Sequence, residues 1–147
     1  MSRGKVLDLL RPDEAGKLQV ACSTEVFGEV RALAPFRLPG GNRDYLALTS
    51  DSGRLVILEY DRAGGGWNKL HQETYGKSGA RRAVPGQYLA ADPRGRAVMV
   101  AALERTRLVY TLNRDSDSAL TISSPLEAHK SQTVTFAVAG LDVGYDN

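Results

Sequence analysis

Residues 44–74 read DYLALTSDSGRLVILEYDRAGGGWNKLHQET, and this stretch predicts three consecutive β-strands. A short apolar run at 45–49 is followed by Ser50-Asp51-Ser52-Gly53, whose side chains favour a tight turn and whose glycine tolerates a positive φ. The β-branched and aromatic run RLVILEY at 54–60 is typical of a strand. A loop at 61–66 leads into a third, more polar run at 67–74. No helix fits between these turns, so we expect an antiparallel meander.

The same pattern recurs near both ends of the chain. GKVLDLL at 4–10 and TRLVYTL at 106–112 are each an apolar strand opened by a basic residue and followed by a polar loop and another strand. A period of about 50 residues built from short strands is typical of β-propeller blades. A plain antiparallel sandwich with evenly spaced turns is the alternative. We therefore predict an all-β fold, a partial β-propeller with WD40-like blades of four antiparallel strands.

The repeats divide the chain into about two full blades with partial blades on either side. We expect a partial blade at 1–25, full blades at 29–74 and 87–123, and the first strand of a further blade at 133–143. The segments at 75–86 and 125–132 are predicted to be connectors, because they hold proline, glycine or polar residues. A propeller closes when its last sheet is completed by a strand from the other end of the chain. Since no segment is left to do so, we expect the chain to be a piece of a larger protein.

Composition places the chain among globular proteins. Of its 147 residues, 42% are hydrophobic and 24% are charged, which is enough to bury a core. The net charge of +2 is too balanced to indicate nucleic acid or a membrane as partner, and the longest apolar run, at 97–103, is too short to span a bilayer. The single cysteine, Cys22, excludes an internal disulfide and suits a reducing compartment. Because Met1-Ser2-Arg3 leads directly into a strand, we expect no signal peptide.

Several segments resemble a known family. They are SDSGRLVILEY (50–60), HQETYGKSGARRAVPGQYLAADPRGRAVMVAALE (71–104), LNRDSDSALTISSPLEAHKSQT (112–133) and GLDVGYDN (140–147), together with the opening SRGKVLDLLRPD (2–13). They are similar to part of the N-terminal propeller in the family of splicing factor 3b subunit 3, and the resemblance covers essentially the whole chain. The family has three β-propellers and belongs with the large subunits of the damaged-DNA-binding factor and of the cleavage and polyadenylation factor.

The resemblance implies a nuclear, non-catalytic scaffold with no small-molecule substrate. Members of that family hold a HEAT-repeat subunit and a small helical subunit of splicing factor 3b, and the resemblance implies the same partners for this chain. The complex acts in pre-mRNA splicing, within the small nuclear ribonucleoprotein that recognises the branch site, and the contact of this subunit with RNA is expected to be indirect or minor. Two alternatives stay open. One is an RNA-binding module, which requires a basic cluster beside exposed aromatics, and the other is a ubiquitin-ligase adaptor like the damaged-DNA-binding relative.

No motif in the chain meets the spacing rules of an enzyme or a cofactor site. Gly76-Lys77-Ser78 resembles the end of a phosphate-binding loop, but His71 stands where that motif needs glycine and Pro85 opposes the helix that must follow. Two residues apart on a strand, His71 and Glu73 share one face, yet zinc takes three or four ligands. We expect these two side chains to pair and His129 to occupy a solvated loop. We predict no catalytic residue, no metal and no cofactor.

The densest basic cluster, Lys77, Arg81 and Arg82, lies in the connector at 75–86. Connectors between blades cannot place their amides in a sheet ladder, so they lie on the surface, where binding residues are common. Arginine is also enriched at protein interfaces because its planar guanidinium makes paired hydrogen bonds. We therefore predict that these three residues contribute to a protein interface. Phosphate binding and bonds that only tie neighbouring blades together are the alternatives.

Overall fold

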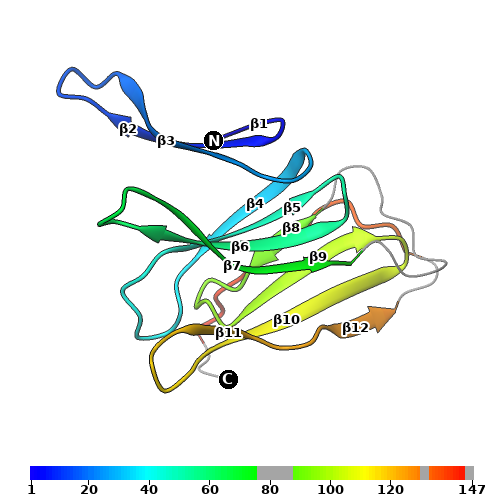
Figure 1. The fold of residues 1–147 in the computed structure, drawn as a ribbon. Helices are drawn as coiled ribbons and strands as arrows, with labels where there is room; N and C mark the ends of the chain where they lie inside the picture. Colours follow the sequence, from blue (N-terminus) through cyan, green and yellow to red (C-terminus); the bar gives the residue numbers. More distant parts are fainter. Residues whose placement is uncertain (76–87, 130–132, 145–147) are drawn as a thin grey trace.

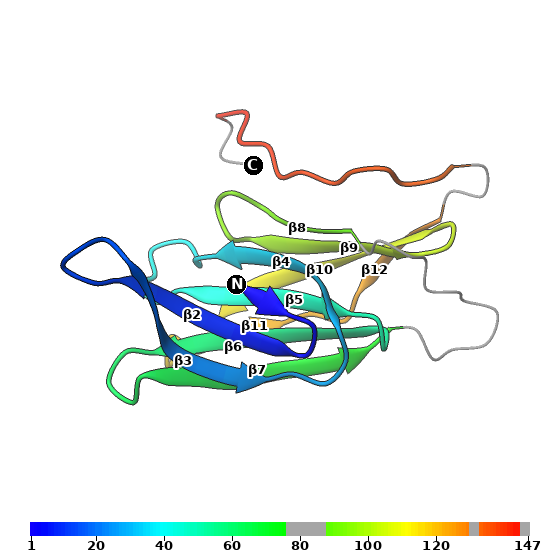
Figure 2. The ribbon, with the colours of Figure 1, turned by 90° about the horizontal axis from the view of Figure 1, so that it is seen from above.

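The computed structural model describes residues 1–75, 88–129 and 133–144, and within these ranges the chain forms twelve β-strands and no helix. The strands make three antiparallel sheets that follow one another along the chain (Figure 1). In Figure 1 the sheets are stacked as layers, with the second sheet between the first and the third, and in Figure 2 they overlap because they are seen from above. The predicted all-β class is confirmed.

The first sheet has three strands: β1 (Ser2–Arg3), β2 (Val6–Pro12) and β3 (Leu18–Glu25), paired in that order. The sequence predicted two strands in this region, and the additional β1 pairs with β2 through only two residues. Asp8 is buried in this sheet and accepts hydrogen bonds from the Ser23 hydroxyl at 2.5 Å and from Arg3 at 2.9 Å. The Ser23 bond is the largest cause that holds the pKa of Asp8 below its usual range. A charged carboxylate is therefore accommodated inside the sheet by its bonds.

The second sheet is the predicted meander preceded by one more strand. It contains β4 (Val30–Phe36), β5 (Tyr45–Ser50), β6 (Arg54–Asp61) and β7 (Gly66–Thr74), paired in chain order. In the β5–β6 turn, Gly53 has a φ of 73° and its N–H donates to the Ser50 carbonyl. The register of β6 on β7 shifts between Ile57 and Leu58, which leaves Leu70 without a partner residue as a β-bulge.

The third sheet contains β8 (Leu89–Ala91), β9 (Ala97–Leu103), β10 (Thr106–Arg114), β11 (Leu120–Ile122) and β12 (Leu126–His129). The end of β10 pairs with β11 and its beginning with β12, so these two short strands form one interrupted outer strand. At the interruption, Ser123 bonds to the backbone of Thr111 through both its N–H and its hydroxyl. We expected 126–129 to belong to the connector 125–132, because Pro125 and the polar residues after it indicate a break; these residues instead form β12.

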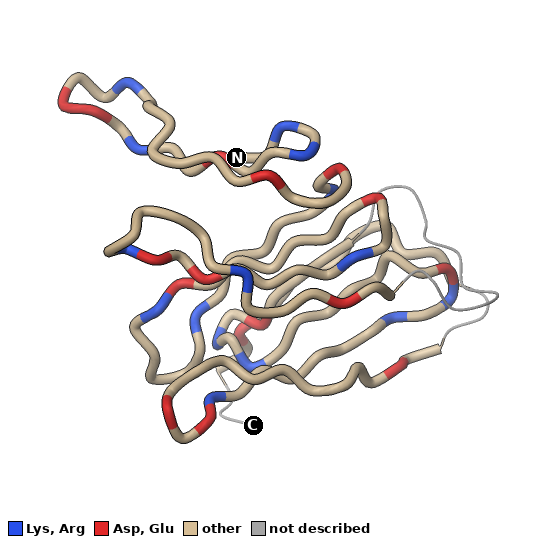
Figure 3. The backbone as a smooth tube through the Cα atoms, viewed as in Figure 1, with Lys and Arg blue, Asp and Glu red and all other residues tan. Residues whose placement is uncertain are grey.

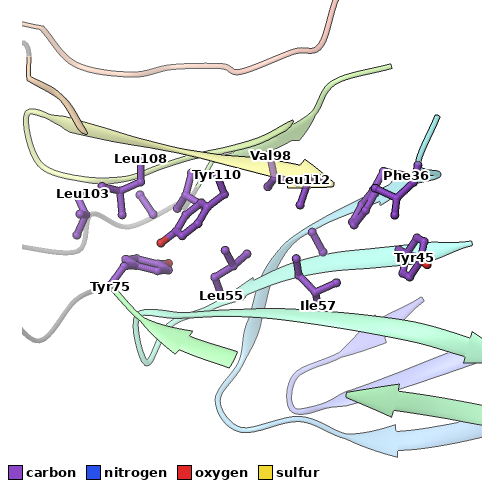
Figure 4. Packing of buried hydrophobic residues seen from close by; sticks show 14 residues of the cluster. Phe36, Tyr45, Leu55, Ile57, Tyr75, Val98, Leu103, Leu108, Tyr110 and Leu112 are labelled. Carbon is purple, nitrogen blue, oxygen red and sulfur yellow. The ribbon is translucent and has the colours of Figure 1, made fainter. Parts of the chain in front are cut away.

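The strand β6 of the second sheet is buried on both faces. Leu55 and Ile57 face the third sheet, in a core of fourteen buried residues that includes Tyr110 (Figure 4). Val56 and Leu58 face the first sheet, where they pack in a second cluster. Successive side chains of a strand point to opposite faces, so a strand covered on both sides needs apolar residues at every position. Each buried Leu or Ile contributes about 1.5–3 kcal/mol, and the stacking of the sheets therefore stabilises the fold.

The described C-terminal segment, 133–144, runs beside the third sheet, on the side away from the second (Figure 2). We expected the first strand of a further blade at 133–143, but the described part of the chain has no strand there. A strand is defined by the hydrogen-bond ladder to a neighbour, and none of the twelve described strands pairs with this segment. Its apolar side chains Val134, Phe136, Leu141 and Val143 are exposed.

We expect Gly53→Val to destabilise the second sheet by about 1–3 kcal/mol, because a β-branched side chain is strained at positive φ. Gly53 has a φ of 73°. Thermal unfolding followed by circular dichroism should show a melting temperature lower by roughly 3–10 °C. Gly53→Asn is the matched control and should lose less than half as much, since Asn tolerates this conformation. An unchanged melting temperature for Gly53→Val would contradict the assignment of the turn.

Candidate protein-interaction surface

The predicted interface residues Lys77, Arg81 and Arg82 lie in the segment 76–87, outside the residues that the structure describes. The Gly76-Lys77-Ser78 motif lies in the same segment. The interface role of the three cations therefore stays a prediction, and the described residues bear only on where the connector begins and ends.

Both ends of the connector are fixed by backbone hydrogen bonds. The Tyr75 N–H donates to the Gly53 carbonyl at 2.8 Å, and the Tyr88 carbonyl accepts from the Ala101 N–H at 2.8 Å. The connector thus leaves the second sheet beside the β5–β6 turn and enters the third sheet beside β9. Figure 1 shows both points at the same end of the stacked sheets.

At the start of the connector, a tyrosine is anchored in the core. Tyr75 is 4% exposed, and the fully buried Tyr110 of β10 lies in the same cluster (Figure 4). The two hydroxyls have no hydrogen-bond partner among the described residues. Burial raises the pKa of both hydroxyls well above the usual range, and the nearby Glu73 carboxylate raises that of Tyr110 further. Both side chains are therefore neutral at physiological pH and act as packing residues.

The predicted pair of His71 and Glu73 is confirmed, with 3.4 Å between the imidazole Nε2 and the carboxylate. In the register of β6 on β7 they lie opposite Ile57 and Leu55, on the face turned toward the third sheet. His129 is exposed, as expected, but it lies in β12 rather than in a loop, and its Nδ1 is 3.3 Å from the Thr106 hydroxyl.

Among the described residues, no three His, Cys, Asp or Glu side chains are grouped so that they could hold a metal ion. The same residues include no helix that is long and apolar enough to cross a membrane.

Three large aromatic residues pack between the sheets. Phe36 and Tyr110 are buried in the core between the second and third sheets. The ring of Phe36 stacks on Tyr45, with 5.3 Å between the centroids. Trp67 packs against the cluster on the other side of the second sheet. These rings are therefore structural and do not form a platform for stacking bases.

The opposite end of the sheets carries loops in which positive and negative side chains alternate (Figure 3). Asp44 accepts hydrogen bonds from Arg37 and Arg62, and the Arg37 bond is the largest cause that lowers the pKa of Asp44. Arg43 pairs with Glu59 at 2.8 Å. Such exposed pairs contribute about 0–1 kcal/mol each, so their main effect is to neutralise charge at this end of the sheets.

Sequence reasoning missed the residues that hold the C-terminal segment. Arg107 on β10 donates to the Thr133 and Thr135 hydroxyls at 3.1 and 3.0 Å. Further along, Gly140 packs so closely on β8 that a Cβ there would lie 2.2 Å from the Ala91 carbonyl oxygen. These partners are far apart in the sequence, and no local pattern of residue types signals them.

The family of the chain follows from a comparison with known domains. The family model described as the RSE1/DDB1/CPSF1 first beta-propeller matches residues 1–147. The chain belongs to this family. The stacked antiparallel sheets are accordingly blades of the RSE1/DDB1/CPSF1 first propeller, and the predicted partial propeller is confirmed.

Three relatives of the chain are named as spliceosomal or splicing proteins. The chain is 60% identical over 147 residues to Spliceosome-associated protein 130 A of Arabidopsis thaliana, and 60% identical over 148 residues to Splicing factor 3B subunit 3 of Drosophila melanogaster. It is 53% identical over 148 residues to Pre-mRNA-splicing factor RSE1 of Mycosarcoma maydis. Each comparison covers 100% of this chain and 12% of the relative. The resemblance inferred from the sequence is therefore confirmed, and the chain spans 12% of the length of these relatives.

Proposed function

We propose that the chain is part of a non-catalytic β-propeller scaffold of the splicing factor 3b complex. In this role it acts in pre-mRNA splicing in the nucleus, within the small nuclear ribonucleoprotein that recognises the branch site. The observation that carries the proposal is the identity of 53–60% to proteins named as splicing factors, which extends over the whole chain.

A scaffold role is supported by what the titratable groups do. The carboxylates of Asp8 and Asp44 are engaged by hydroxyl and guanidinium donors that lower their pKa values. The buried phenols of Tyr75 and Tyr110 are held neutral in the core. An acid or base catalyst needs a pKa near the working pH, and these shifts all lead away from it. These four groups are therefore not suited to acid–base catalysis near neutral pH, which agrees with a binding role for the propeller.

We further propose that the partners are the HEAT-repeat subunit and the small helical subunit, with Lys77, Arg81 and Arg82 as polar contacts. The connector that holds these cations leaves and enters the sheets at one end of the stack, where Tyr75 is anchored in the core. Loops held by a rigid scaffold are where binding residues concentrate. Three cations within six residues also suit an acidic surface of a protein partner.

The test is the double variant Arg81→Ala/Arg82→Ala, in the protein as it is expressed in its own cells. We expect co-purification of both subunits to fall about tenfold or more, because each lost charged hydrogen bond costs roughly 1.5–3 kcal/mol. Arg62→Ala is the matched control; this arginine is 75% exposed, lies at the other end of the sheets, and should leave co-purification unchanged. Melting temperatures establish first that each variant folds.

Undiminished co-purification of both subunits with the double variant would refute the interface role. Loss of RNA crosslinking while both subunits still assemble would instead support the RNA-binding alternative.

A further inference from the structure

A cleft of about 760 Å³ is lined by residues of the second and third sheets. The β10–β11 loop that borders it lies at one end of the sheets (Figure 1). One wall is formed by Leu38 and Pro39 in the β4–β5 loop. The other walls are formed by the end of β10, the β10–β11 loop and the residue before β9; they contribute Arg96, Thr111, Leu112, Asn113, Arg114, Asp115 and Ser118. The cleft thus combines apolar walls with two guanidinium groups.

Arg114 is held in place within this cleft. It pairs with Leu120 in the register of β10 on β11 and shares a face with Leu112, which is turned toward the second sheet. Its guanidinium donates to the Gly40 carbonyl at 3.3 Å. Gly40 has a φ of 65°, and a Cβ there would lie 3.1 Å from the guanidinium. The side chain of Arg114 therefore reaches across the cleft and lies close against the opposite loop.

Arg114 differs from the other arginines at this end of the sheets. Arg37, Arg43 and Arg96 each have a carboxylate partner within the chain. Within the described residues, the Arg114 guanidinium bonds only to a carbonyl, and its side chain is exposed. Most of its N–H donors and its full positive charge are therefore available to a ligand.

The charges around the cleft favour one carboxylate over a chain of phosphates. Asp92 neutralises Arg96, and the Asp115 carboxylate is occupied by the N–H groups of Asp117 and Ala119, both at 2.9 Å. A single carboxylate beside Arg114 adds one negative charge to a site that already holds Asp115 and Asp117. A nucleic-acid backbone carries a negative charge at every nucleotide and would add several. Leu38 and Leu112 also offer apolar contact, which suits the neighbours of an acidic residue in a protein segment.

We propose that this cleft is a docking site for an aspartate or glutamate side chain on an apolar segment of a partner protein, with Arg114 as the recognition residue. The planar guanidinium can bond both oxygens of a carboxylate, and its bond to Gly40 fixes its orientation before the partner arrives. The site lies at the end of the sheets opposite the connector, so it is independent of the interface proposed for Lys77, Arg81 and Arg82.

The experiment places a photo-crosslinking amino acid, benzoylphenylalanine, at position 39 in the protein expressed in its own cells. Pro39 is exposed and lines the cleft. After irradiation, mass spectrometry locates the crosslinked residue. We expect it within a few residues of an Asp or Glu in a partner protein. Arg114→Gln keeps a donor for Gly40 but removes the charge, and it should reduce the crosslink about tenfold. Arg114→Glu, combined with Arg at the located acid, should restore it.

Lys17→Gln, which removes an exposed cation in the β2–β3 loop, is the matched control and should leave the crosslink unchanged. Arg114→Lys shows whether the charge or only the fold is needed, because it keeps the charge and should retain most of the crosslink. The proposal is overturned by a crosslink to RNA or to a second copy of this chain, by an equal yield with Arg114→Gln, or by no crosslink.

Discussion

Gly95→Ala is expected to destabilise the chain by about 2–6 kcal/mol, because one methyl group meets two separate costs. Gly95 lies in the β8–β9 turn at a φ of 71°, where a side chain strains the backbone by roughly 1–3 kcal/mol. A Cβ would also lie 1.7 Å from the Arg37 carbonyl oxygen in the β4–β5 loop. Because that obstacle is backbone, the two sheets must separate, at a further cost of about 1–3 kcal/mol.

The measurement is thermal unfolding of the Gly95 variant against Gly65→Ala. Gly65 has a nearly equal φ of 68° but no atom within 4 Å of its Cβ position. The control therefore carries the backbone strain without the collision, and its melting temperature should fall by about half as much. Equal decreases in melting temperature for the two variants would show that Gly95 does not lie in close contact with the Arg37 carbonyl of the β4–β5 loop.

Tyr110→Ala is expected to destabilise the chain by about 3–5 kcal/mol, the usual cost of removing a large buried ring. Tyr110 is 0% exposed and lies in the core between the second and third sheets (Figure 4). Tyr110→Phe keeps the ring and removes a hydroxyl that has no hydrogen-bond partner among the described residues. It should be neutral or slightly stabilising, since a buried polar group without a partner is unfavourable.

Chemical denaturation of both variants separates the two contributions. The alanine variant should unfold at a clearly lower denaturant concentration, while the phenylalanine variant should match or exceed the original protein. If Tyr110→Phe lost more than about 1 kcal/mol, its hydroxyl would have to be hydrogen-bonded in solution.

The sequence was most informative where local chemistry decides structure. The turn at Ser50-Asp51-Ser52-Gly53 and the apolar run at 54–60 predicted two strands and the positive φ between them, which the structure has. Large rings in strands commonly pack against a neighbouring sheet, and Phe36 and Tyr110 are buried in this way. These signals depend only on residues close together in the chain.

The parts that were missed depend on distant partners. β12 forms because its residues can complete the edge of β10, although Pro125 indicates a break. The contacts of Arg107 with Thr133 and of Arg114 with Gly40 join residues 26 and 74 positions apart. An arginine in a strand looks the same in sequence whether it meets water, a carboxylate or a carbonyl across a cleft. The connector cations Lys77, Arg81 and Arg82 stay a prediction from composition, whereas the cleft at Arg114 could not be predicted because it depends on residues far apart in the chain.

The alternation of β6 has a consequence for how the protein can change over generations. Leu55 and Ile57 belong to the interface between the second and third sheets, and Val56 and Leu58 to the interface between the first and second sheets. Substitutions at neighbouring positions of β6 therefore act on different interfaces. The tilt of one neighbouring blade can drift through such changes while the tilt of the other is preserved. A single strand thus gives a lineage two independent adjustments of propeller shape.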